Sequence, residues 1–125
     1  MSFYIANAQI IKVKQELQND FFCLFNENYE QIKNPVLKSF ADEYFINAEA
    51  NGCHSIELKY WSHHDFIDAW KGKYQTKYEN GIFSFSYYYN DNGFLHDFYH
   101  DFEDIILPLI TEEIIEQDGW CEPLD

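Results

Sequence analysis

The chain has 125 residues, of which 46% are hydrophobic and 20% aromatic, so it suits one folded domain and excludes a disordered protein. Its net charge of −14 comes from 22 acidic residues, 8 lysines and no arginine, which argues against binding to nucleic acid or to an anionic membrane. It has no apolar run of ~18 residues for a transmembrane helix, no signal-peptide pattern and no CxxC pair, so we expect a single domain over residues 1–125 in the cytoplasm.

The first part of the chain carries the spacing of amphipathic helices. Apolar residues recur every three or four positions between Ala8 and Ile32, which predicts one long helix with Asn7 as its N-cap. Asn34-Pro35 is expected to end this helix and to begin a second one, because proline fits the first turn of a helix. Asn51-Gly52 is expected to end the second helix.

The middle of the chain changes to the alternation of β-strands. Residues 55–61 alternate apolar and polar side chains, which predicts a half-buried strand. Asn80-Gly81 separates two further candidate strands, residues 74–79 and 82–89, and predicts a hairpin because both positions of the turn need a positive φ. The second of these strands places aromatic rings on one face and Tyr88 on the other, where Tyr88 is a candidate contact residue.

Helical spacing returns after the first predicted strand. Residues 62–70 fit a short helix, and an apolar stripe from Leu95 to Ile110 fits a long one, although residues 94–99 also fit a strand. Pro108 is expected to kink the long helix, whose second piece would run to Gln117 before Gly119 ends it. The pattern predicts an α+β fold with two N-terminal helices, a small antiparallel sheet with the Asn80-Gly81 hairpin, and C-terminal helices packed on the sheet.

Negative charge is concentrated at the end of the chain. Residues 1–77 hold 10 acidic residues and all 8 lysines, whereas residues 78–125 hold 12 acidic residues and no lysine. Because the acids alternate with apolar residues, they predict a folded acidic surface and not a tail. Such a surface repels itself, which indicates attraction of a basic protein partner as its benefit. The candidate contact residues are Asp97, Asp101, Glu103, Asp104, Glu112, Glu113, Glu116 and Tyr88.

Two histidines offer an alternative. His96 and His100 are four residues apart, which on a helix places both rings on one face, as in zinc sites, and would suit a small metal-dependent enzyme. The chain has no HExxH motif, no hydrolase signature, no P-loop and no dinucleotide-binding motif. We therefore expect a binding protein with no catalytic residue, metal or cofactor, and keep an acidic regulatory or adaptor protein as a further alternative.

The acids from Asp91 to Glu122 are interleaved with the aromatic residues Phe94, Phe98, Tyr99, Phe102 and Trp120. In size, charge and composition the chain resembles the immunity proteins of bacterial polymorphic toxin systems, including contact-dependent growth inhibition. The resemblance implies an antitoxin, a toxin inhibitor that binds a cognate toxin domain, often a basic nuclease, and blocks its active site or substrate surface. The acidic surface would then occupy a site built for phosphates.

Overall fold

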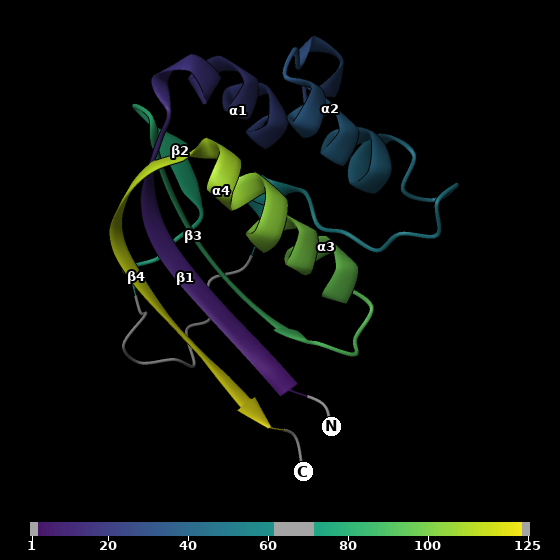
Figure 1. The fold of residues 1–125 in the computed structure, drawn as a ribbon, viewed down its shortest axis with the longest axis vertical. Helices are drawn as coiled ribbons and strands as arrows, with labels where there is room; N and C mark the ends of the chain where they lie inside the picture. The colour runs from purple at the N-terminus through teal and green to yellow at the C-terminus, as the bar shows by residue number, and fades with distance from the viewer. Residues whose placement is uncertain (1–2, 62–71, 124–125) are drawn as a thin grey trace.

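A computed structural model describes residues 3–61 and 72–123 of the chain, with side chains described as far as Gly119, and the fold is α+β as predicted (Figure 1). Four antiparallel strands form one sheet in the order β2-β3-β1-β4. The strands are β1 (Phe3–Val13), β2 (Lys77–Glu79), β3 (Ile82–Asn90) and β4 (Thr111–Pro123). The predicted helix over residues 62–70 lies outside the described residues.

The first element is a strand, so the predicted helix from Ala8 to Ile32 is wrong in its first half. β1 is the central strand and has buried residues on both faces, Ala6 and Ala8 on one and Ile11 and Val13 on the other. A strand that is apolar on both faces loses strict alternation, and its spacing then imitates a helix. Helix begins only after Val13, with a 3₁₀ turn (Gln15–Leu17), α1 (Gln18–Phe25) and a second 3₁₀ turn (Tyr29–Gln31).

The helix predicted to start at Asn34-Pro35 is confirmed. α2 (Pro35–Ala41) starts with the Asn34 side chain accepting hydrogen bonds from the backbone N–H groups of Val36 and Leu37. A π-helical segment, η3 (Asp42–Ile46), extends it, so the helix ends five residues before Asn51. Residues 55–61 are not the predicted strand: they run along the core with one 3₁₀ turn (Leu58–Tyr60).

The Asn80-Gly81 hairpin is confirmed, since Asn80 has φ 55° and Gly81 φ 78°, and β2 and β3 pair on either side of it. The helical alternative for the segment after Phe94 is also confirmed. α3 (His96–Asp101), the π-helical segment η6 (Phe102–Ile106) and α4 (Leu107–Ile110) follow one another without a break. The π-helical turn immediately precedes Pro108, which has no N–H to donate back to the helix.

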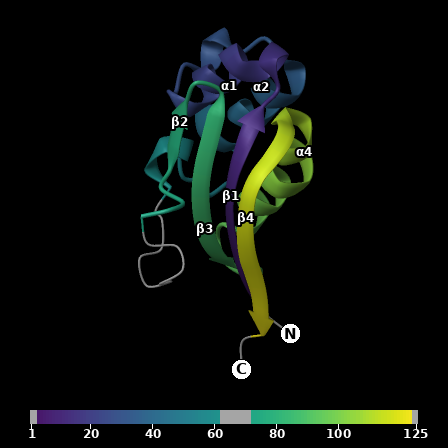
Figure 2. The same cartoon turned by 90° about the vertical axis from the view of Figure 1, so that its left-hand side faces the viewer.

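The helix does not continue to Gln117 as predicted. The chain turns at Thr111 into β4, which runs beside β1 along almost its whole length (Figure 2). Two register shifts leave Ile115 and Glu112 of β4 without a partner in β1. Gly119 lies inside this strand and does not end a helix. The strand approaches β1 so closely here that a Cβ on residue 119 would lie 2.5 Å from the carbonyl oxygen of Ala6.

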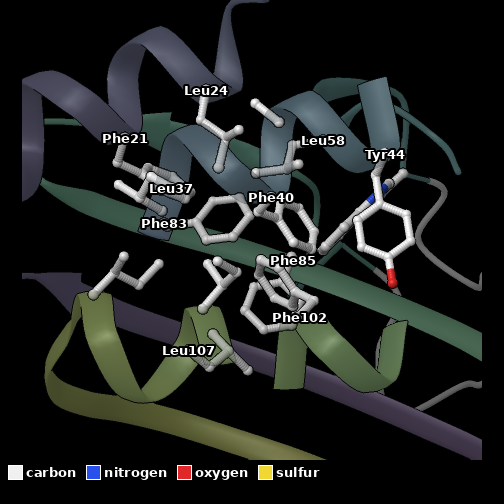
Figure 3. Close-up of a cluster of buried hydrophobic side chains, with 14 of the residues drawn as sticks. Phe21, Leu24, Leu37, Phe40, Tyr44, Leu58, Phe83, Phe85, Phe102 and Leu107 are labelled. Atoms are coloured by element: carbon white, nitrogen blue, oxygen red, sulfur yellow. The ribbon is translucent and has the colours of Figure 1, made fainter. Parts of the chain in front are cut away.

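The helices cover one face of the sheet and enclose an aromatic core (Figures 1 and 3). As predicted, the four alternate aromatic residues of β3 from Phe83 to Tyr89 are buried on this face, and Figure 3 shows Phe83 and Phe85 between side chains of α2 and of the C-terminal helix. Trp61 lies among these rings and donates its indole N–H to the Ile56 carbonyl at 2.7 Å. Among the described helices none has the length and apolar character needed to cross a bilayer.

Candidate functional site

The predicted acidic residues of the C-terminal helix divide between two sides of it. Asp97 and Asp101 lie four residues apart on the side that faces α2 and solvent, and Asp104 lies one turn further on, beside His100. Asp97 and Asp104 are exposed and Asp101 is half-buried. Tyr44 of η3 donates its hydroxyl to the Asp101 carboxylate and also lies 3.1 Å from the Asp97 carbonyl oxygen. These contacts fix the acids of α3 against the preceding helix.

A groove between α2 and the α3–η6 helix runs beside these acids. It has a volume of about 340 Å³ and is lined by Pro35, Val36, Ser39, Phe40, Glu43, Asp101 and Ile105. Val36 and Ile105 are 39% and 46% exposed, so the groove has an apolar floor, while Glu43 and Asp101 give it an acidic rim. Sequence reasoning missed Glu43 because its place beside Asp101 depends on how two separate helices pack.

An exposed aromatic ring extends the same surface. Phe94 is 83% exposed, touches the His54 ring at a centroid distance of 5.0 Å, and lines a pocket together with Glu43 and Asp97. A largely solvent-exposed phenyl ring beside carboxylates is typical of the anchor of a protein interface. We call this region the α2–α3 surface and define it by Val36, Glu43, Phe94, Asp97, Asp101, Asp104 and Ile105.

The α2–α3 surface has no lysine to balance its acids among the residues that the structure describes. The nearby Lys38 amine is held by Asp42 at 3.1 Å and by Glu30 at 3.9 Å. Within residues 3–61 and 72–119, Asp104 pairs with His100 alone, at 3.3 Å, and this pair carries attraction only when the histidine is protonated. The surface is therefore both acidic and partly apolar.

The predicted acids of β4 lie elsewhere, and two of them are paired. Glu112 forms an ion pair with Lys12 at 3.0 Å, and Glu116 forms one with Lys73 at 2.9 Å. Each pair raises the pKa of its lysine. The expectation that the acids of residues 78–125 form a self-repelling surface is thus wrong at Glu112 and Glu116, because the fold brings lysines from earlier in the chain to the strand. Glu113 is exposed on the same edge strand.

Glu103 does not belong to the exposed acidic surface. It is half-buried on the side of the helix that faces the sheet, where it accepts hydrogen bonds from the hydroxyls of Tyr87 at 2.7 Å and Tyr89 at 3.2 Å. Burial raises the pKa of its carboxyl group, while the two tyrosine hydrogen bonds act in the opposite direction. Both tyrosine hydroxyls also have raised pKa values, mainly because they are buried.

Tyr88 lies on the opposite face of the sheet from the α2–α3 surface. It is half-buried and stacks on Tyr4 of β1 at a ring-centroid distance of 4.7 Å. A partner that contacts α3 from the helix side does not reach it. The structure therefore separates Tyr88 from the acids with which it was predicted to act.

His96 and His100 share a side of α3, with ring centroids 5.3 Å apart. No group of three or more histidine, cysteine or carboxylate side chains suited to a metal ion occurs within residues 3–61 and 72–119. The Cys53 thiol has a raised pKa because of burial and neighbouring carboxylates, which disfavours the thiolate that a nucleophile requires.

Comparison of the chain with protein family models, with curated proteins and with solved structures finds no match. The functional argument therefore rests on the surface and its charges.

Proposed function

We propose that this chain is a cytoplasmic immunity protein that binds a basic toxin domain, a nuclease, and neutralises it through the α2–α3 surface. The observation that carries the proposal is the combination on one surface of unbalanced acids, an apolar groove and an exposed phenyl ring. Acids without neighbouring lysines attract a basic partner and speed its association by roughly ten- to a thousand-fold. The apolar groove and Phe94 then supply the contact area that keeps the complex together.

We revise the predicted contact residues in two respects. Asp97, Asp101 and Asp104 remain candidates, and Phe94 and Ile105 join them as apolar anchors beside the acids. Glu112 and Glu116 carry less net attraction, because each already has a lysine partner. An acidic surface of this kind suits a nuclease, whose active site and substrate groove are built to hold phosphates.

The neighbouring reading frame provides the test. If it encodes a large secreted protein with a basic C-terminal domain, that domain is expressed from an inducible promoter in cells with and without this chain. The proposal predicts growth only when the chain is present. Growth arrest that persists with the folded chain present in excess would contradict it.

A pair of charge-reversed variants locates the surface. Asp101→Lys combined with Asp104→Lys should lose protection, because it places two lysines on the α2–α3 surface. Glu16→Lys combined with Glu79→Lys changes the net charge equally at two exposed positions away from it and should keep protection. Equal loss in both double variants would assign the effect to net charge and would reject the α2–α3 surface as the contact.

A further inference from the structure

A second pocket lies on the other side of the C-terminal helix, between η6–α4 and the strands β1 and β4. Its volume is about 520 Å³, and its walls are mostly aliphatic. Four polar side chains, Asn7, Gln9, Glu103 and Thr111, also line it. β4 is the edge strand of the sheet, so this side of the molecule is open to a partner (Figures 1 and 2).

The polar groups of this pocket form a relay that points at one carboxylate. Gln9 donates its amide to the Asn7 side-chain oxygen at 3.3 Å, and Asn7 donates to the Tyr87 hydroxyl at 2.9 Å. Tyr87 in turn donates to Glu103 at 2.7 Å. Each donor is aimed inward, so the relay stabilises negative charge on Glu103.

The charged group left over for a ligand is an acceptor, Glu103, while the side-chain amides of Asn7 and Gln9 each keep one N–H to donate. A carboxylate offers about four lone-pair positions, and the two tyrosines occupy two of those on Glu103. No lysine among the described residues forms an ion pair with Glu103. A ligand that completes the site must donate hydrogen bonds, carry positive charge and tolerate apolar walls.

An arginine side chain meets these requirements together. Its methylene groups suit the walls formed by Leu107 and Ile114, and its planar guanidinium group offers several donors to a carboxylate and an adjacent amide oxygen. A lysine ammonium group is more strongly hydrated and donates as a point charge, so it fits a half-buried carboxylate less well. A free metal ion would find only one carboxylate here.

We propose that this pocket receives one arginine side chain of the basic partner, with its guanidinium group against Glu103. The identity of the partner rests on the proposed function, but the preference of the pocket does not. The partner would then contact both sides of the C-terminal helix, with the α2–α3 surface giving attraction and the Glu103 pocket giving a single directional anchor.

The test uses the whole chain and a small probe. N-acetyl-arginine methylamide is titrated into ¹⁵N-labelled protein at constant ionic strength, and the side-chain amide signals of Asn7 and Gln9 are followed by NMR. We expect saturable shifts of these signals with the arginine probe. We expect no such shifts with the uncharged Nα-acetyl-citrulline methylamide, and weaker shifts with Nα-acetyl-lysine methylamide, whose side-chain ammonium group is free.

Two variants serve as a matched pair. Glu103→Gln should weaken binding of the arginine probe at least about tenfold, because the charge-assisted hydrogen bond is lost. Glu79→Gln removes the same charge at an exposed position on β2, the opposite edge of the sheet, and should leave binding unchanged. Equal binding of the citrulline probe, tighter binding of the lysine probe, or unchanged binding to a folded Glu103→Gln variant would each overturn the proposal.

The two proposals can fail separately. Absence of a toxin partner would leave the probe titration as it is. Absence of probe binding, with protection still lost on charge reversal of Asp101 and Asp104, would reject only the arginine pocket.

Discussion

Replacing Glu103 with leucine should destabilise the fold far more than the same change at its neighbour Asp104. Glu103 accepts hydrogen bonds from the hydroxyls of Tyr87 and Tyr89. These two tyrosines are only 1% and 4% exposed. Leucine would leave both hydroxyl donors without their acceptor at the edge of the aromatic core. Each unsatisfied buried donor costs about 1–3 kcal/mol, and release of the half-buried carboxylate offsets part of this, so we expect a loss of about 2–4 kcal/mol.

The assay is urea unfolding followed by far-ultraviolet circular dichroism. A loss of this size is a large fraction of the roughly 5–15 kcal/mol that stabilises a domain, so the midpoint should move clearly at an unchanged slope. Asp104→Leu, at an exposed position, should stay within about 0.5 kcal/mol of the parent. Glu103→Gln keeps an acceptor and should lie between the two. Equal stability of the two leucine variants would refute the placement of the Glu103 side chain between the helix and the sheet.

Two further predictions concern strand β4 and the buried tyrosines. Gly119→Ala should destabilise the protein by about 1–3 kcal/mol in the same urea assay, because the added Cβ would meet the Ala6 carbonyl oxygen. A neutral effect would show that β4 does not approach β1 so closely. Seven described tyrosines have a raised pKa, mainly through burial, so their contribution to stability should be constant below about pH 10, the unfolded-state value, and should fall as pH rises above it. Urea midpoints at pH 8 and pH 11, with tyrosinate absorbance recorded alongside, measure this, and equal midpoints would contradict the burial of these rings.

Predictions that depend on neighbouring residues agree with the structure. The Asn80-Gly81 turn follows from the positive φ that both residues adopt, and the start of α2 follows from Asn34 and Pro35. The helix after Phe94 follows from an apolar stripe long enough to decide between helix and strand. In each case the deciding signal lies within one short segment.

Two of the three wrong elements, β1 and β4, are strands whose nature depends on distant partners, and the third is the strand predicted over residues 55–61, which pairs with no other strand. β1 is apolar on both faces because it is central, and β4 is a strand because it pairs with β1. The residues of β4 from Glu112 to Gln117 are rich in glutamate and isoleucine, and their local preference does not oppose a helix. Pairing with β1 overrides it.

The candidate site was predictable in kind but not in arrangement. The sequence revealed the acids of α3, whereas the Lys12 and Lys73 pairs, the inward turn of Glu103 and the Glu43 rim all arise from tertiary contacts. Those contacts reduce an acidic segment to a smaller surface with defined apolar neighbours. They also separate that surface from Tyr88 on the far face of the sheet.

The central claim is that acids on the α2–α3 surface steer a basic partner, and an association-rate measurement tests it most directly. The rate is recorded at low and high salt with the purified basic domain from the neighbouring reading frame. The account predicts a rate that falls with salt and that falls at least about tenfold for Asp101→Lys with Asp104→Lys, but much less for Glu16→Lys with Glu79→Lys. A rate that is insensitive to salt, or equally reduced in both double variants, would contradict it.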